Sequence, residues 1–282
     1  MKATGSYRIA RGRVSGKSGP SASMGTVSKA LTLLTYFNHG RLEIGLSDLT
    51  RLSGMNKATV YRLMSELQEA GFVEQVEGAR SYRLGPQVLR LAALREASVP
   101  ILSASRRVLR ELSEDTGETT HLSLLQGEQL ASLSHAYSSR NATKVMMEDA
   151  EVLTFHGTAS GLAVLAYSEP SFVDAVLAAP LTARTPQTQT DPAAIRAEIA
   201  EVRRTGLAQS IGGFEAEVHS HAVPIFGPDR AVLGALAVAA PTSRMTPDQK
   251  RTIPPALRAA GLSLTERIGG ACPPEFPTDI AA

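Results

Sequence analysis

The chain has 282 residues, a formal net charge of +2 and one cysteine, Cys272, which excludes an intrachain disulfide and a cysteine metal cluster. Its longest apolar run, residues 231–240, is too short to span a bilayer, and the polar, basic N-terminus has no signal-peptide core. These features argue against a membrane-embedded or disulfide-stabilised secreted protein and predict a bacterial cytoplasmic one.

The charge is distributed unevenly along the chain. Residues 1–90 hold 13 Lys and Arg against 6 Asp and Glu, a net of +7, whereas residues 91–282 hold 16 against 21, a net of −5. A polyanion-binding module joined to an acidic remainder is therefore expected. Residues 1–25 carry five basic side chains and no acid among Gly and Ser, which predicts a disordered basic arm. This arm either follows DNA phosphates or is a solvated tail that touches nothing.

Residues 26–85 have the pattern of a winged helix-turn-helix. A first helix is predicted over residues 27–37, and a second, short helix is expected to be capped by Ser47. Gly54 provides the turn to a third helix, which starts at the N-cap Asn56 and ends before Gly71. The apolar residues of the first helix recur at core spacing: Val27, Ala30, Leu31, Leu34 and Phe37.

The third helix has an apolar side and a cationic side. Its apolar seam, at helical period, consists of Val60, Leu63, Met64 and Leu67. Two strands, residues 72–76 and 80–84, are predicted to follow around a glycine turn. Such a unit leaves one helix face free to enter a DNA major groove. The alternative is an all-helical packing unit with an ordinary solvated face.

The N-terminal part of a recognition helix normally meets base edges. Arg62 is expected to read guanine through a bidentate pair, and Ala58 and Thr59 to touch a thymine methyl group. Arg80 and Arg83 are expected to hold phosphates, and Arg51 to do either. The full predicted DNA-contacting set is Lys57, Ala58, Thr59, Tyr61, Arg62, Arg51, Arg80 and Arg83.

A helical linker is predicted over residues 86–116. Pro86 is well placed to start a helix that runs to about Ala97, and Pro100 interrupts the pattern before it resumes over residues 101–114. The apolar residues of the first part fit a dimer seam and internal core equally well: Leu89, Leu91, Ala92 and Leu94.

Residues 117–270 predict a second domain of the α+β class, with an antiparallel sheet flanked by helices as in GAF and PAS domains. Predicted strands cover residues 119–125, 129–136, 218–226 and 231–239. Predicted helices cover residues 156–167, 171–177, 192–205 and 246–268, with an interruption expected at Pro254–Pro255. Residues 271–282 are expected to form a disordered tail.

Several stretches, in this order and spacing, resemble the isocitrate lyase regulator (IclR) family of bacterial transcription factors over residues 25–269. They are LSDLTRLSG at 46–54, GFVEQ at 71–75, YRLGP at 82–86, TGETTHL at 116–122, HGTASG at 156–161 and PTSRMTP at 241–247. The resemblance implies a winged helix-turn-helix, a linker helix and an effector domain with a cup-shaped sheet. It also implies dimers, or dimers of dimers, that bind operator DNA under the control of a small organic molecule.

The resemblance places an effector pocket at the start of the helix that follows His156. The implied lining is Ala159, Ser160, Ser210, Val218, Ser220, Ala237 and Ala239. Free N–H groups at that helix start can receive a carboxylate. Ala237 and Ala239 stand where the family often has serine, so the expected ligand is an aromatic or acyl compound with one anionic or amide end. The alternative is a packed core without a ligand.

His219 and His221 lie on one strand face at a spacing that can supply two zinc ligands, although a third would have to come from elsewhere. They are expected instead to border the pocket mouth or to be ordinary strand residues, and His156 to start a helix. No metal or other cofactor is expected.

Signature motifs of hydrolases, phosphate-loop enzymes, dinucleotide enzymes and zinc proteases are missing from the sequence, so no enzyme activity is expected. The sequence predicts a ligand-responsive repressor that binds a pseudo-palindromic operator. The alternatives are a second domain that only oligomerises, and a bifunctional enzyme and regulator.

Overall fold

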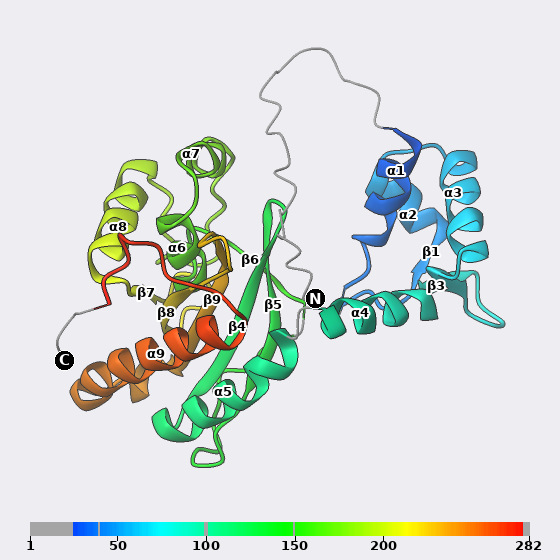
Figure 1. The fold of residues 1–282 in the computed structure, drawn as a ribbon. Coiled ribbons are helices and arrows are strands. Elements are labelled where there is room, and N and C mark those ends of the chain that lie inside the picture. Colours follow the sequence, from blue (N-terminus) through cyan, green and yellow to red (C-terminus); the bar gives the residue numbers. More distant parts are fainter. Residues whose placement is uncertain (1–24, 39, 99–100, 149, 279–282) are drawn as a thin grey trace, which may run out of the picture.

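The computed structural model describes residues 25–38, 40–98, 101–148 and 150–278. Two parts are seen in Figure 1, a head (residues 26–84) and a larger body (residues 101–278), with helix α4 (Pro86–Ser98) after the head. The predicted basic arm lies outside the described residues, apart from Gly25. None of the helices in the described ranges is long and apolar enough to cross a membrane.

The head is a winged helix-turn-helix, as predicted. It consists of α1 (Thr26–Leu34), α2 (Leu46–Ser53), α3 (Lys57–Glu69) and the strands β1 (Ile44–Gly45), β2 (Val73–Gln75) and β3 (Ser81–Leu84). The sheet has the order β1-β3-β2, and Tyr82 on the central strand pairs with Ile44 and Gln75. We call the β2–β3 hairpin the wing. The two-residue strand β1 was not predicted, because it is too short to show an alternating pattern.

The core of the head confirms the apolar seam of α3 and corrects the predicted face of α1. Val27 and Leu31 are 71% and 54% exposed, while Leu33, which was not expected in the core, is fully buried. The packed face of α1 runs through Leu33. Three of the five predicted residues, Ala30, Leu34 and Phe37, are partly buried and pack against this core, so the prediction is wrong for Val27 and Leu31. The buried head residues are Leu33, Ile44, Leu49, Val60, Leu63, Met64, Leu67, Val73 and Tyr82.

Local hydrogen bonds explain where the head helices begin and end. The side-chain oxygen of Asn56 accepts a bond from the Thr59 N–H at 2.8 Å, which confirms the predicted N-cap of α3. Gly54 ends α2 with φ at +66°, a conformation that favours glycine. The expected cap at Ser47 is wrong, because β1 runs directly into α2 and the N-cap is Gly45.

The body is an antiparallel six-stranded sheet between two helical layers, which confirms the α+β class (Figure 1). The sheet order is β6-β5-β4-β9-β8-β7. Its strands are β4 (Thr119–Gln126), β5 (Gln129–Ala136), β6 (Val152–Leu153), β7 (Ala208–Ile211), β8 (Val218–Phe226) and β9 (Val232–Pro241). The edge strands β6 and β7 were not predicted, because both are short.

The two helical layers of the body have separate cores. One core contains buried residues of α6 (Ala159–Ala166), α7 (Pro170–Ala178) and α8 (Pro192–Thr205). The other contains buried residues of α5 (Ile101–Thr116) and α9 (Pro247–Arg267), which follows the short helix η1 (Thr242–Arg244). Pro254 and Pro255 lie inside α9 and do not interrupt it. The flanking residues Ile253 and Leu257 are fully buried and hold that turn of the helix on the body.

The predicted disordered tail is wrong for residues 271–278, because an aromatic side chain in this segment belongs to the core of the body. Phe276 is 7% exposed, and its ring lies 5.4 Å from that of Phe226 and 5.6 Å from that of Tyr167. Burial of an aromatic ring outweighs the polar, proline-rich composition around it. Residues 279–282 lie outside the described part of the chain.

Phe276→Ala is expected to lower the free energy of unfolding by about 3 kcal/mol, because it removes a buried ring and leaves a cavity. Urea denaturation followed by circular dichroism measures this change. The neighbouring exposed residue provides the control, since Glu275→Ala removes no buried area. Equal effects of the two substitutions would contradict the role assigned to the ring.

Candidate functional site

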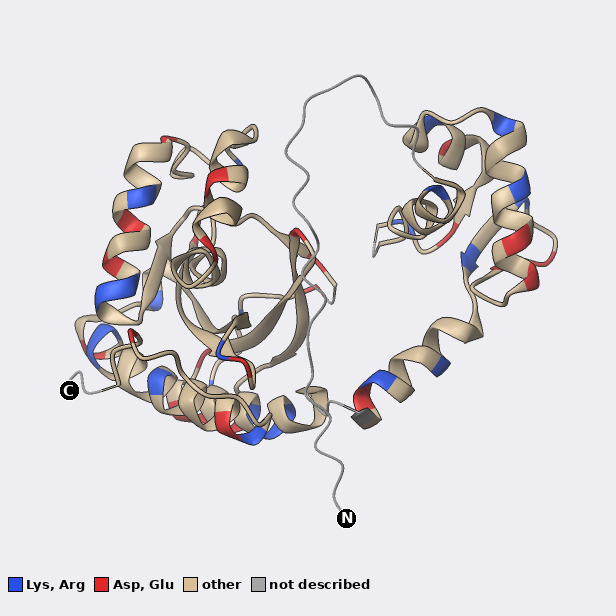
Figure 2. Cartoon of the chain, turned by 45° about the horizontal axis from the view of Figure 1, so that its top comes forward, with Lys and Arg blue, Asp and Glu red and all other residues tan. Residues whose placement is uncertain are grey.

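The cationic side of α3 is free of packing within the head. Lys57, Ala58, Tyr61 and Arg62 are exposed, and Thr59 is partly buried. Basic residues lie toward the N-terminal half of α3, and its acidic residues lie toward the C-terminal half (Figure 2). The positive end of the helix dipole adds to this gradient. The structure thus brings the predicted residues of α3 together on one accessible surface.

Three of the predicted arginines form surface ion pairs. Arg62 contacts Glu66 at 2.7 Å, Arg51 contacts Asp48 at 2.9 Å, and Arg83 contacts Glu74 at 2.5 Å. All six side chains are well exposed, and such pairs contribute only about 0.2–1 kcal/mol each. The guanidinium groups can therefore exchange these carboxylates for phosphates or base edges at little cost. Arg80, at the exposed tip of the wing, has no ion-pair partner among the described residues.

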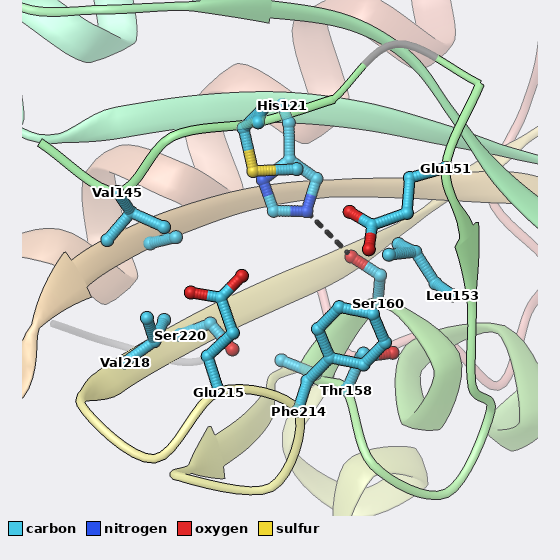
Figure 3. Close-up of a pocket in the computed structure, with 13 residues that line it drawn as sticks. His121, Val145, Glu151, Leu153, Thr158, Ser160, Phe214, Glu215, Val218 and Ser220 are labelled. Carbon is cyan, nitrogen blue, oxygen red and sulfur yellow. Dashed lines mark hydrogen bonds between the residues drawn. The ribbon is translucent and has the colours of Figure 1, made fainter. Parts of the chain in front are cut away.

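A pocket in the body is the second candidate site (Figure 3). Strands β4, β6, β8 and β9, the start of α6, and two loops enclose it. Five of the seven predicted effector residues line it: Ala159, Ser160, Val218, Ser220 and Ala239. That these residues bind an effector stays a prediction.

Two predicted lining residues do not reach this pocket. The hydroxyl of Ser210 donates to the backbone oxygen of Gly157 at 2.9 Å and so supports the turn before α6. Ala237 is fully buried in the core that contains α6. Ser210 is a partly buried residue of strand β7 and Ala237 precedes Ala239 by two residues on β9, and neither lies at this pocket. That either residue binds an effector stays a prediction. His156 also does not start a helix, since α6 begins at Ala159 after the N-cap Thr158.

The floor of the pocket holds a histidine and a serine. His121 Nε2 lies 3.3 Å from Ser160 Oγ, and the opposite ring nitrogen of His121 is buried without a partner among the described residues. Burial, with a further contribution from His135, lowers the pKa of His121 to about 4, so the ring is neutral at pH 7. A neutral histidine with so low a pKa and no acceptor to orient it is a weak general base. The pair therefore suits ligand binding better than hydrolysis.

The mouth of the pocket carries two carboxylates, Glu151 and Glu215, whose oxygens point into it (Figure 3). Burial raises the pKa of Glu151, and Glu148 and Glu215 add to this, while Arg184 opposes it. The Arg184 guanidinium lies 4.0 Å from the Glu151 carboxylate and 3.8 Å from the ring centre of Phe214. The pocket is therefore acidic at its mouth.

Sequence reasoning missed more than half of the lining. The missed residues are His121, Val145, Met147, Glu151, Leu153, Thr158, Phe214 and Glu215. Four of them come from residues 145–153 and two from the loop before β8, where the chain is irregular and has no period to read. Two of the missed residues had a usable signal: His121 lies on a predicted strand next to the strand that carries Ala239, and Thr158 directly precedes Ala159 in the HGTASG stretch.

His219 and His221 do not border the pocket mouth, which corrects that expectation. Successive side chains of β8 alternate between the two faces of the sheet, so Ser220 lines the pocket and the histidines lie on the opposite face. Their rings stack at 4.8 Å, and His219 Nε2 lies 2.9 Å from the amide nitrogen of Gln209. No group of three His, Cys, Asp or Glu side chains suited to a metal ion occurs within the described ranges.

Comparison with known proteins agrees with this architecture. Residues 26–77 match the IclR helix-turn-helix domain, and residues 94–266, more than half of the chain, match the C-terminal domain of bacterial IclR transcriptional regulators. The chain belongs to the IclR family. It is thus a DNA-binding transcriptional regulator.

The matches to curated proteins and solved structures cover nearly the whole length of those relatives. XynR, a helix-turn-helix transcriptional regulator of Escherichia coli K12, is 29% identical over 245 residues, which cover 86% of this chain and 97% of XynR. A crystal structure described as an IclR transcriptional regulator from Silicibacter sp. TM1040 is 99% identical over 90% of this chain and 100% of that one, with a TM-score of 0.64.

One further relative carries a bound small molecule. An IclR homologue from Microbacterium hydrocarbonoxydans, crystallised with 4-hydroxybenzoate, is 24% identical and has a TM-score of 0.72. The match covers 86% of this chain and 99% of that one. At this identity the likeness shows the fold alone.

Acid is expected to destabilise the body through its buried histidines. Burial lowers the pKa of both His121 and His221 to about 4, with His219 and Lys250 adding to the effect on His221. As the pH falls below about 6.5, the unfolded chain binds these protons first. Stability is therefore complete above about pH 6.5 and declines toward pH 4, by up to about 3 kcal/mol for each histidine.

Urea denaturation at several pH values checks this expectation. His221→Gln should flatten the dependence of the unfolding free energy on pH between about 6.5 and 4, since glutamine binds no proton there. Carboxylates titrate alike in both proteins, so they do not affect the comparison. If the unfolding free energies of the variant and the parent chain depend on pH in the same way, His221 does not cause the loss of stability in acid.

Proposed function

We propose that this IclR-family regulator is a repressor that binds a pseudo-palindromic operator as a symmetric oligomer and responds to a small organic effector. The supporting observation is that one chain carries both an exposed cationic α3 surface and, in the body, a pocket lined by apolar and ionisable side chains. A relative named transcriptional repressor IclR, from Escherichia coli K12, is 24% identical over 252 residues and supports the sign of regulation. Operator binding would place the protein in the bacterial cytoplasm.

In the proposed complex, the N-terminal half of α3 enters the major groove. Arg62 leaves Glu66 and forms a bidentate pair with guanine, while Ala58 and Thr59 approach a thymine methyl group. Lys57 and Tyr61 lie on the same surface and complete the base-reading set. Arg51, Arg80 and Arg83 hold phosphates and fix the register of the head on the duplex.

Self-association is proposed through α4. Leu89, Leu91 and Leu94 are 75%, 42% and 55% exposed, so within the described chain they are not internal core. An exposed apolar helix is typical of an interface between copies. A two-fold dimer through α4 would pair two heads and predicts half-sites about 34 Å, or a multiple of it, apart.

Control by the effector follows from linkage. A ligand that binds the pocket more tightly in one arrangement of the paired heads shifts the population toward that arrangement and changes operator affinity accordingly. The pocket favours this reading over a body that only oligomerises, because an oligomerisation module needs no cavity with ionisable side chains in its lining. The 4-hydroxybenzoate bound to the Microbacterium homologue supports an organic ligand.

Arg62→Ala is expected to weaken operator binding by about 1–3 kcal/mol and to relax the preference at one base position. Fluorescence anisotropy with an operator selected from random DNA, and with its single-base variants, measures both effects. Arg251→Ala is the matched control, because Arg251 forms the same kind of exposed pair with Asp248 on α9. Unchanged affinities of the Arg62 variant for operator and random DNA would refute the proposed role.

The paired substitution Leu91→Glu and Leu94→Glu is expected to convert a dimer to a monomer, because it introduces like charges into the proposed interface. Light scattering measures the mass, and operator binding should weaken with it. Leu42→Glu, at a head residue that is 67% exposed, is the control and should leave the mass unchanged. A full-size oligomer in the doubly substituted chain would place the interface elsewhere.

A further inference from the structure

The charge of the pocket lining points to a class of ligand. Its two ionisable acids, Glu151 and Glu215, converge on the same space as the Ser160 hydroxyl and the neutral His121 ring (Figure 3). The lining contains no lysine or arginine within the described residues. The remaining wall is mostly apolar: Val145, Met147, Leu153, Phe214, Val218 and Ala239.

Glu215 is the less compensated of the two acids. Its carboxylate has no ion-pair or hydrogen-bond partner in the described part of the chain, and only its backbone oxygen is bonded, to the Val218 N–H. Glu151 has a distant partner in Arg184, at 4.0 Å. Arg184 is also stacked on Phe214, and this one cation offsets only one of the two negative charges.

We propose that the pocket binds an organic cation, an amphipathic amine whose ammonium group lies between Glu151 and Glu215 and whose apolar part packs on the opposite wall. The inference deepens the proposed function and rests on this pocket being the effector site. It differs from the sequence-based expectation of a ligand with an anionic or amide end.

An ammonium group satisfies the polar atoms that the pocket presents. It has donors for both carboxylates and for the Ser160 oxygen, and neutral His121 adds no opposing charge. Its positive charge also compensates Glu215, which strengthens the bonds to both acids. Glu151 is partly buried, so its attraction for the cation is screened less than at the surface, and the exposed Glu215 adds a second negative charge beside it.

An anion meets the opposite situation. The start of α6 offers two backbone N–H groups, at Ala159 and Ser160, while the Gly161 N–H is already bonded to the Thr158 hydroxyl. A carboxylate held there would share the pocket with the carboxylates of Glu151 and Glu215, and like charges in one pocket repel each other. A divalent metal ion is not favoured either, since no suitable group of three ligands occurs among the described residues.

Three probes of matched shape test this proposal on the full chain: 2-phenylethylamine, 3-phenylpropanoate and the neutral 2-phenylethanol. Isothermal titration calorimetry at pH 7.5 is expected to show the amine binding about tenfold or more tightly than the carboxylate, with the alcohol between them. Glu215→Gln should reduce the preference for the amine about tenfold. Glu151→Gln provides a second variant, in case the first does not fold.

Glu217→Gln is the matched control, because Glu217 is exposed, lies two residues from Glu215 and does not line the pocket. It should leave the preference unchanged. The proposal is overturned if the carboxylate binds as tightly as the amine, if no amine binding is detected at millimolar concentration, or if Glu215→Gln and Glu217→Gln behave alike.

Operator affinity measured with each probe separates this proposal from the proposed function. If only 3-phenylpropanoate binds and shifts operator affinity, the result supports the proposed effector function and refutes the proposed preference for a cation. If the amine binds in a manner that depends on Glu215 but operator affinity does not change, the cation site stands and its regulatory role falls.

Discussion

The alternation of side chains across the body sheet is the constraint on which both layers of the body depend. Along β8, Val218 and Ser220 face the pocket, while His219 and His221 face the other way. A register slip of one residue would exchange these faces and put two imidazoles into the pocket. Nine paired positions with β9 hold the register, and the buried helices on either side hold the faces. The pairing of β8 with β9 therefore determines which side chains line the pocket.

In the head, the weakness of the exposed arginine–carboxylate pairs suits the proposed binding of these arginines to DNA. Arg51, Arg62 and Arg83 are paired with exposed carboxylates, and breaking such a pair costs less than breaking a buried contact. In the body the situation is reversed. Glu118 is almost fully buried and accepts two bonds of 2.6 Å from Arg244 and a third from Gln249. Such a fork is geometrically specific and holds the start of β4 near the start of α9.

The parts of the fold with a clear period could be predicted from the sequence. The seam of α3, the cap at Asn56 and the bounds of α8 and β8 follow from apolar spacing and from residues with one local role. The face of α1 was predicted only in part, since a nine-residue helix with apolar residues on several sides gives no unique answer. The tail was misjudged, because one aromatic residue among polar neighbours gives no periodic signal.

The site was predictable only where a regular element carries it. Residues of α6, β8 and β9 were located through the family resemblance, whereas Glu151 and Glu215, which set the charge of the pocket, come from irregular segments. Their arrangement depends on how two loops pack over the sheet, and no spacing rule encodes that packing.

The exposure of α4 has a consequence for how such a molecule behaves on dilution. None of its described side chains is buried, and an isolated helix of 13 residues is only marginally stable in water. If two copies associate through α4 as proposed, formation of the helix and association of the copies share one equilibrium. The concentration of the protein in the cell would then influence operator binding as well, because it would determine what fraction of the heads is held in pairs before any effector binds.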